Sequence, residues 1–222
     1  MKNNVIITKS CTIENETFSD WSNSSIDGLK IDGEFDENLT VHVNNCTFTR
    51  ENLDPAEADE LCSVICGGKA YFNNCVFKCS GKGVLIGTGS DNELDKDTIY
   101  VEFHNCIFED LSRRHPYVNA GTVKLFNCTI KNWGKDQYFH EKSAGVRGGS
   151  DAKIELYNCK FEQESFWTCF RRKNKWKDIF NQYLFPFLYF GFMRGAYAEK
   201  GGKIKIENCT KNHWWIILRE TK

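Results

Sequence analysis

A short basic segment is the part of this sequence whose residue types are best suited to chemistry. Arg113, Arg114 and His115 are consecutive and stand directly before Pro116. Adjacent arginines can bind an anion, because a guanidinium group donates hydrogen bonds to carboxylates and stays protonated. A histidine can act as a general base near neutral pH, and His104 is a second candidate for that role. For both histidines a structural position remains the alternative interpretation.

Cysteine is abundant, with 11 residues in a chain of 222. Cys62, Cys66, Cys75 and Cys79 form two C-x3-C pairs, which suggests a zinc site or disulfides among these four. An odd number of cysteines cannot all pair within one chain. Because six cysteines belong to a repeat, we expect most of them to be reduced thiols in the core.

The elements that position these residues are indicated by a repeated dipeptide. Asn-Cys occurs six times, each time after a short strand in which apolar and polar residues alternate. The copies are Asn45-Cys46, Asn74-Cys75, Asn105-Cys106, Asn127-Cys128, Asn158-Cys159 and Asn208-Cys209. A period of two within the unit predicts strands rather than helices. A constant unit with connections of variable length is typical of a solenoid.

We therefore expect one all-β domain over residues 1–222, a parallel β-helix of about seven to eight coils that includes a weaker unit at Ser10-Cys11. Asparagine suits the bend between two strands, because it tolerates the left-handed conformation and can hydrogen-bond along the axis. The next cysteine should face inward. An aromatic and basic insertion at about 166–197 interrupts the pattern. It is either a flap on the stack or a contact surface, with 176–193 as the candidate for a protein partner.

The overall charge excludes some classes of partner. The net charge is −1, from 29 Lys and Arg against 30 Asp and Glu, which gives no case for nucleic acid or a membrane surface. The apolar run 183–190 contains a proline and is too short to span a bilayer. Residues 1–8 have no apolar run of the length that a secretory signal needs, and the cysteine content slightly favours a reducing compartment.

The stretch from Lys82 to Trp133 resembles pectate lyases of the largest polysaccharide-lyase family. That family carries, in order, K-x-x-L-I-G, an Asp-bearing loop, V-T-x-H-H-N-x-F, R-x-P-x-x-R-x-G and V-H-x-x-N-N. This chain has, in the same order, K-G-V-L-I-G from Lys82, Ser90-Asp91, V-E-F-H-N-C-I-F from Val101, R-H-P-Y-V-N-A-G from Arg114, and V-K-L-F-N-C from Val123. The family fold is a right-handed parallel β-helix, so the resemblance implies the same handedness here.

The resemblance also implies a reaction. Pectate lyases cleave polygalacturonate, an acidic polysaccharide, by β-elimination, and calcium helps to stabilise the developing charge beside the sugar carboxylate. By match, Arg114 takes the position of the catalytic base and Lys82 that of the residue that binds the substrate carboxylate. Arg113 and His115 flank Arg114 and are candidates for substrate binding. Asn119 takes the place of the second arginine in the R-x-P-x-x-R segment.

This chain departs from the family where calcium is bound. Asn44 corresponds to an acidic residue, and the two acidic positions of the next coil correspond to Asp59 and Ser63. Calcium prefers several anionic oxygen ligands, so Glu57 and Asp59 are the candidate ligands, with a solvated acidic loop as the alternative. We expect a calcium-assisted lyase that acts on an acidic glycan. The alternative is a catalytically degenerate β-helix that binds carbohydrate or has a structural role. The family is secreted, although this chain shows no signal peptide.

Overall fold

The chain folds as an all-β structure with parallel pairing. The computed structural model describes residues 4–19, 27–34, 36, 38–50, 60–78, 82–88, 98–111, 115–133, 144–164 and 193–221. Every strand pair within these ranges is parallel. A helix long and apolar enough to cross a membrane is not found among these residues.

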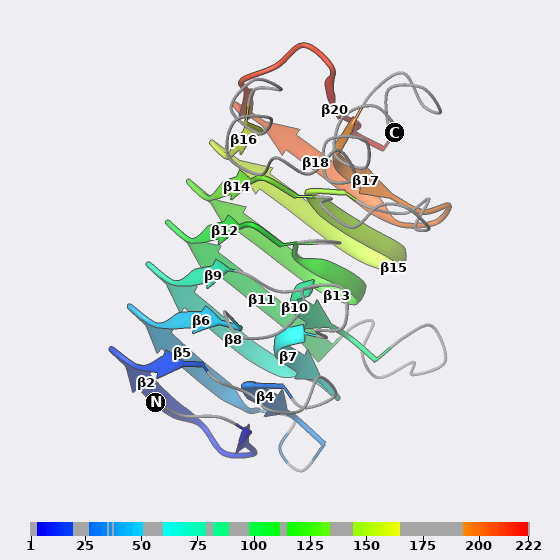
Figure 1. Cartoon of the computed structure of the whole chain (residues 1–222). Helices are drawn as coiled ribbons and strands as arrows, with labels where there is room; N and C mark the ends of the chain where they lie inside the picture. Colours follow the sequence, from blue (N-terminus) through cyan, green and yellow to red (C-terminus); the bar gives the residue numbers. More distant parts are fainter. Residues whose placement is uncertain are drawn as a thin grey trace.

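The strands stack into three faces, and the chain passes through them in a repeating order (Figure 1). Face 1 contains β1 (Val5–Ile7), β4 (Leu29–Asp32), β7 (Glu60–Ile65), β10 (Lys82–Ile86), the first parts of β13 (Tyr117–Phe126) and β15 (Val146–Tyr157), β17 (Met193–Ala198) and β20 (Ile216–Leu218). Face 2 contains β2 (Cys11–Glu14), β5 (Thr40–Asn44), β8 (Gly68–Asn73), β11 (Ile99–His104), the second parts of β13 and β15, and β18 (Lys203–Glu207). Face 3 contains β3 (Thr17–Phe18), β6 (Thr47–Thr49), β9 (Val76–Lys78), β12 (Ile107–Glu109), β14 (Thr129–Lys131), β16 (Lys160–Glu162) and β19 (Thr210–Lys211). This order is consistent with a β-helix or solenoid, with the two chain ends at opposite ends of the stack.

Asparagine makes the corner between face 2 and face 3. The residues at this corner all have a positive φ: Asn15, Asn45, Asn74, Asn105, Asn127, Asn158 and Asn208, between 53° and 56°. This left-handed region is the one that asparagine tolerates best after glycine. Side-chain amides of Asn45, Asn74 and Asn105 each donate to the asparagine one coil earlier, at 3.4, 3.3 and 3.3 Å. The predicted hydrogen-bonded column of asparagines is therefore confirmed at these coils.

Replacing one asparagine of this column tests what the corner requires. Asn105→Ala is expected to lower the free energy of unfolding by about 2 kcal/mol, because alanine resists the left-handed backbone and the bond to Asn74 is lost. Asn105→Gly keeps the backbone conformation and should be closer to wild type. Urea denaturation monitored by circular dichroism measures both variants. An equal loss in the two variants would contradict the backbone explanation.

Two columns of phenylalanine fill the core between face 2 and face 3. Phe48, Phe77 and Phe108 stack along face 3 with ring centroids 4.7 and 5.0 Å apart. Phe72 and Phe103 stack along face 2 at 4.9 Å. The two columns meet edge to face, for example at 5.3 Å between Phe103 and Phe108. The stacking distance matches the spacing of about 4.8 Å between neighbouring strands, so the rings reinforce the backbone ladder.

The third corner, from face 3 back to face 1, varies in length from coil to coil. The chain runs from each face 3 strand to the next face 1 strand through connections of very different length. The parts of these connections that lie outside the described residues are 20–26, 51–59, 79–81, 112–114, 134–143 and 165–192. Residues 193–198, at the end of the predicted aromatic and basic insertion, form strand β17.

The C-terminal residues close the last coil. Strand β20 pairs with β17, so the apolar tail adds a strand to face 1. The exposed edge of β18 is covered by side chains of the final residues. The Ile204 amide donates to Thr221 Oγ1 at 2.7 Å, and the Ile206 amide donates to Glu220 Oε1 at 3.2 Å. This capping satisfies backbone groups that an edge strand leaves open.

Candidate functional site

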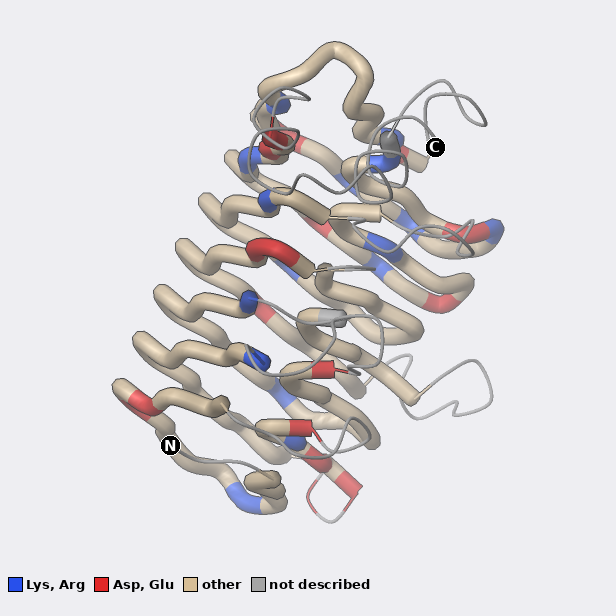
Figure 2. The backbone as a smooth tube through the Cα atoms, in the orientation of Figure 1, with Lys and Arg blue, Asp and Glu red and all other residues tan. Residues whose placement is uncertain are grey.

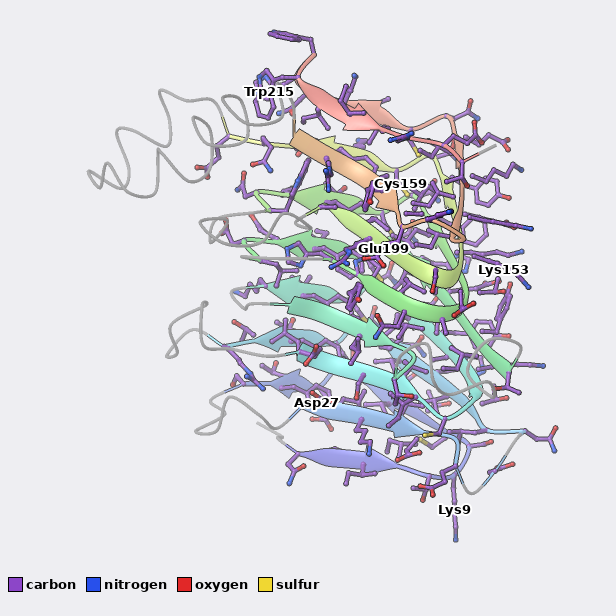
Figure 3. The ribbon with its side chains drawn as sticks, turned by 90° about the vertical axis from the view of Figure 1, so that its right-hand side faces the viewer. Lys9, Asp27, Lys153, Cys159, Glu199 and Trp215 are labelled. Atoms are coloured by element: carbon purple, nitrogen blue, oxygen red, sulfur yellow. The ribbon has the colours of Figure 1, made fainter. Side chains whose placement is uncertain are left out.

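Acidic and basic residues meet at the start of the face 1 strands. In the register of β7 and β10, Glu60 pairs with Lys82. In the register of β4 and β7, Leu29 pairs with Cys62, so Asp27 stands opposite Glu60. Asp27, Glu60 and Lys82 therefore occupy the same position on three consecutive coils. Figure 3 faces this side of the molecule, with Asp27 beside β4.

Asp27 contacts a buried serine of the next coil. The Ser63 hydroxyl donates a hydrogen bond to the Asp27 carboxylate, and Ser63 is only 2% exposed. Ser63 is the residue that replaces an acid in the comparison with pectate lyases. The previous coil thus brings a carboxylate to the same place. The sequence comparison missed Asp27, because residues 1–40 lack an Asn-Cys unit that would have aligned them with the later coils.

The strand that begins with Lys82 and the strand that follows Arg114 in the sequence are neighbours in the stack. Leu85 of β10 pairs with Tyr117 of β13. A Cβ atom on Gly83 would lie 3.7 Å from Nδ1 of His115, so these two residues are in close contact across the coils. Lys82 directly precedes the first of them and Arg114 directly precedes the second. Arg113, Arg114 and the side chain of Lys82 themselves lie outside the described residues.

His115 and Asn119 are both engaged with the backbone. The imidazole of His115 is fully buried, and its Nε2 lies 2.8 Å from the carbonyl oxygen of Leu111. The amide of Asn119 donates to the carbonyl oxygen of Gly87 at 3.1 Å. These contacts fix the path of the chain on either side of Tyr117. The imidazole of His115 would contact a substrate only if the residues that bury it moved away.

The remaining sequence candidates are on face 2 or outside the described residues. Asn44 bonds to Glu14 and to Asn73, at 3.0 and 2.9 Å, within face 2. His104 also belongs to face 2, where its Nε2 lies 2.7 Å from Glu102 and its ring stacks on Phe126. Burial raises the pKa of Glu102, but hydrogen bonds from Tyr100 and His104 outweigh it and lower the pKa overall.

The described residues do not by themselves form a metal site. No group of three or more His, Cys, Asp or Glu side chains converges within them. Cys62, Cys66 and Cys75 form no disulfide bond within these residues, while Cys79 lies outside them. Glu57 and Asp59, the predicted calcium ligands, also lie outside the part of the chain that is described. Asp27 with Ser63 supplies oxygen atoms, which calcium prefers, but too few for its coordination shell.

A buried arginine stands further along the same face and was not anticipated from the sequence. Arg147 of β15 pairs with Tyr117 on one side and Tyr197 on the other. Its side chain is 2% exposed and forms an ion pair with Glu199, which Figure 3 labels near the end of β17. The guanidinium carbon lies 4.8 Å from the centroid of the Tyr117 ring. Atoms Nε and Nη1 have no hydrogen-bond partner within the part of the chain that the structure describes.

The outer side of face 2 carries both acidic and basic residues. Figure 2 shows lysine and arginine interspersed with aspartate and glutamate along the coils. Near the C-terminal end, a shallow hollow is lined by three lysines, Lys153, Lys203 and Lys205, together with Glu155 and Glu220. With three lysines against two glutamates, the residues that line the hollow carry a net positive charge, which favours an anionic ligand.

Comparison with known proteins gives no assignment. No family model matches this chain, and no solved structure matches it.

Proposed function

We propose that the protein is a right-handed parallel β-helix that cleaves an acidic, polygalacturonate-type polysaccharide by calcium-assisted β-elimination. The observation that supports this proposal is the contact between Gly83 of β10 and His115 at the start of β13. The residues that directly precede them are Lys82 and Arg114. The resemblance to pectate lyases gives these two residues the roles of carboxylate binding and proton removal.

The proposed chemistry depends on having two cations together. An ammonium group on Lys82 would pair with the sugar carboxylate and stabilise the negative charge that develops when the neighbouring C–H proton leaves. An arginine ordinarily stays protonated. A second cation nearby disfavours its charged form, which is the direction that a base requires. The proton passes to Arg114, a carbon–carbon double bond forms, and the glycosidic C–O bond breaks with its electrons going to the leaving oxygen.

Calcium belongs to the proposal as an added source of positive charge at the sugar carboxylate. Glu57 and Asp59 are the proposed ligands, and Asp27 beside Ser63 is a further carboxylate on the same face. The shared position of Asp27, Glu60 and Lys82 on three coils supports this placement.

The direct test follows the absorbance of the unsaturated uronide product. The full-length protein is incubated with polygalacturonate at alkaline pH, with calcium or with a chelator. We expect absorbance to rise with calcium and to stop when calcium is chelated. A polymer whose carboxylates are methyl-esterified is the control, and it should react more slowly because it lacks the charge that Lys82 binds. If no acidic polymer gave product with calcium present, lyase activity would be ruled out.

A second candidate is binding of an acidic glycan without turnover. The lysine-lined hollow on face 2 favours it, as does Asn119, whose amide is already bonded to Gly87 where the family has an arginine. Calorimetric titration with oligogalacturonate tests this candidate in the absence of product formation. The double variant Lys153→Gln and Lys203→Gln should weaken binding if the hollow is used.

A further inference from the structure

The last cysteine of the core column differs from the others in its contacts. Inside the stack, each thiol lies near a carbonyl oxygen of the preceding coil: Cys75 near Val43, Cys106 near Phe72, Cys128 near Phe103 and Cys159 near Leu125, at 3.3 to 3.5 Å. Cys209 has no such bond among the described residues. Like the other thiols, its sulfur lies 3.5 Å from a carbonyl oxygen of its own coil, here that of Glu207, but it also accepts the backbone N–H of Cys159 at 3.4 Å. The sulfur of Cys209 is thus turned toward Cys159.

Cys209 also combines exposure with a cysteine neighbour. Three described cysteines are partly exposed, namely Cys11, Cys66 and Cys209, and the others are buried. Cys11 pairs with Val41, and Cys66 follows a strand in which Ile65 pairs with Asp32, which puts Gly33 opposite it. Among the described residues, only Cys209 is both reachable by a reagent and opposite another thiol.

The register permits a covalent bond between these two residues. Tyr157 pairs with Glu207, and Lys160 pairs with Thr210, so Cys159 and Cys209 stand opposite each other. Neighbouring parallel strands are about 4.8 Å apart, which lies inside the range of Cα separations that disulfides span. Both side chains belong to the core column of the Asn-Cys units.

We propose that Cys159 and Cys209 are a redox-sensitive pair that a small-molecule disulfide converts into a cross-coil disulfide bond. The Cys209 thiolate attacks the small disulfide, forming a mixed disulfide and releasing one thiol. The Cys159 thiolate then attacks the Cys209 sulfur, which forms the protein disulfide and releases the second thiol. The two cysteines lose two electrons and two protons in total, and the small disulfide gains them.

The bond ties the last coil to the rest of the stack. It closes a chain loop from residue 159 to residue 209 that includes the long connection between β16 and β17. Cross-linking a loop restricts the unfolded chain, so oxidation should make the C-terminal end of the stack harder to unfold. Reduction by a thiol reverses the effect.

The experiment incubates the full-length protein with oxidised glutathione and maps its peptides without reduction. We expect a peptide pair joined through Cys159 and Cys209, with the loss of two hydrogen atoms, and a rise in Tm of roughly 5 °C, as loop cross-links of this kind give. Cys209→Ser should abolish both. Cys11→Ser is the matched control, since Cys11 is also partly exposed and should carry only a glutathione adduct in the wild type.

Two results would overturn the proposal. One is folded protein in which Cys209 carries glutathione like Cys11 and never links to Cys159. The other is a link from Cys209 to a different cysteine. Because the readout is peptide mass and Tm, it is independent of any lyase activity.

Discussion

Arg114→Ala should lower the rate of β-elimination by about 10³-fold, the loss expected when a general base is removed. The expectation combines the resemblance to pectate lyases with the contact between Gly83 and His115, the residues that directly follow Lys82 and Arg114 in the sequence. Initial rates of uronide formation measure the effect. Urea denaturation must show that the variant is as stable as the wild type, so that a folding defect is not mistaken for a catalytic one.

Neighbouring positions serve as controls for this variant. Arg113→Ala removes a candidate substrate-binding charge but not the proposed base, so its effect should be smaller than that of Arg114→Ala and should appear mainly as a higher KM. Lys82→Ala should raise KM as well as lower kcat, because it removes a contact with the substrate carboxylate. Undiminished turnover in Arg114→Ala would rule out Arg114 as the base, and a different residue would then have to remove the proton.

Glu199→Gln is expected to lower the free energy of unfolding by about 3 kcal/mol, although it is distant in sequence from the proposed base. The reason is the charge that it leaves behind. Arg147 is 2% exposed and pairs with Glu199, while its Nε and Nη1 make no hydrogen bond. Without the carboxylate, the guanidinium group would be left as a buried charge, with the Tyr117 ring as its remaining partner among the residues described. Chemical denaturation measures the loss.

A double variant separates this effect from simple loss of a contact. Arg147→Met combined with Glu199→Gln removes both charges, and it should recover most of the stability that Glu199→Gln loses. The matched control is Glu155→Gln on face 2, where Glu155 and Lys124 form a 3.5 Å pair with side chains 32% and 28% exposed. That exposed pair should contribute less than about 1 kcal/mol. If Glu155→Gln and Glu199→Gln lowered the free energy of unfolding by a similar amount, the explanation from the buried charge of Arg147 would be wrong.

The corner between faces 2 and 3 was predictable because one local requirement recurs in every coil. A left-handed residue is needed at the bend, and asparagine meets this need at Asn45, Asn74 and the later copies. The inward cysteine and the phenylalanine two residues later follow from the alternation of strands. Because all three features are local, a single sequence is enough to reveal them.

Face 1 was much less visible in the sequence. Strand β7 is buried on both sides along most of its length, so its residues do not alternate between apolar and polar. Strands β13 and β15 run through from face 1 into face 2 as continuous strands, and the bend falls within each strand, at Gly121 with a φ of 93° in β13 and at Gly148-Gly149 in β15. Asp27 and Arg147 are brought onto face 1 by the pairing of neighbouring coils whose residues are far apart in the sequence. Their roles depend on register rather than on any motif in the neighbouring sequence.

The corner that leads from face 3 back to face 1 has a consequence for how such a protein can diversify. Its connections range from short ones near residues 79–81 to a long one around 165–192, yet the pairing on both sides of them is unbroken. Lengthening a loop costs little extra entropy, so new segments can be grafted at this edge with little penalty to the scaffold. An engineer who wants a different ligand preference should therefore exchange these connections and leave the strands of the coils unchanged.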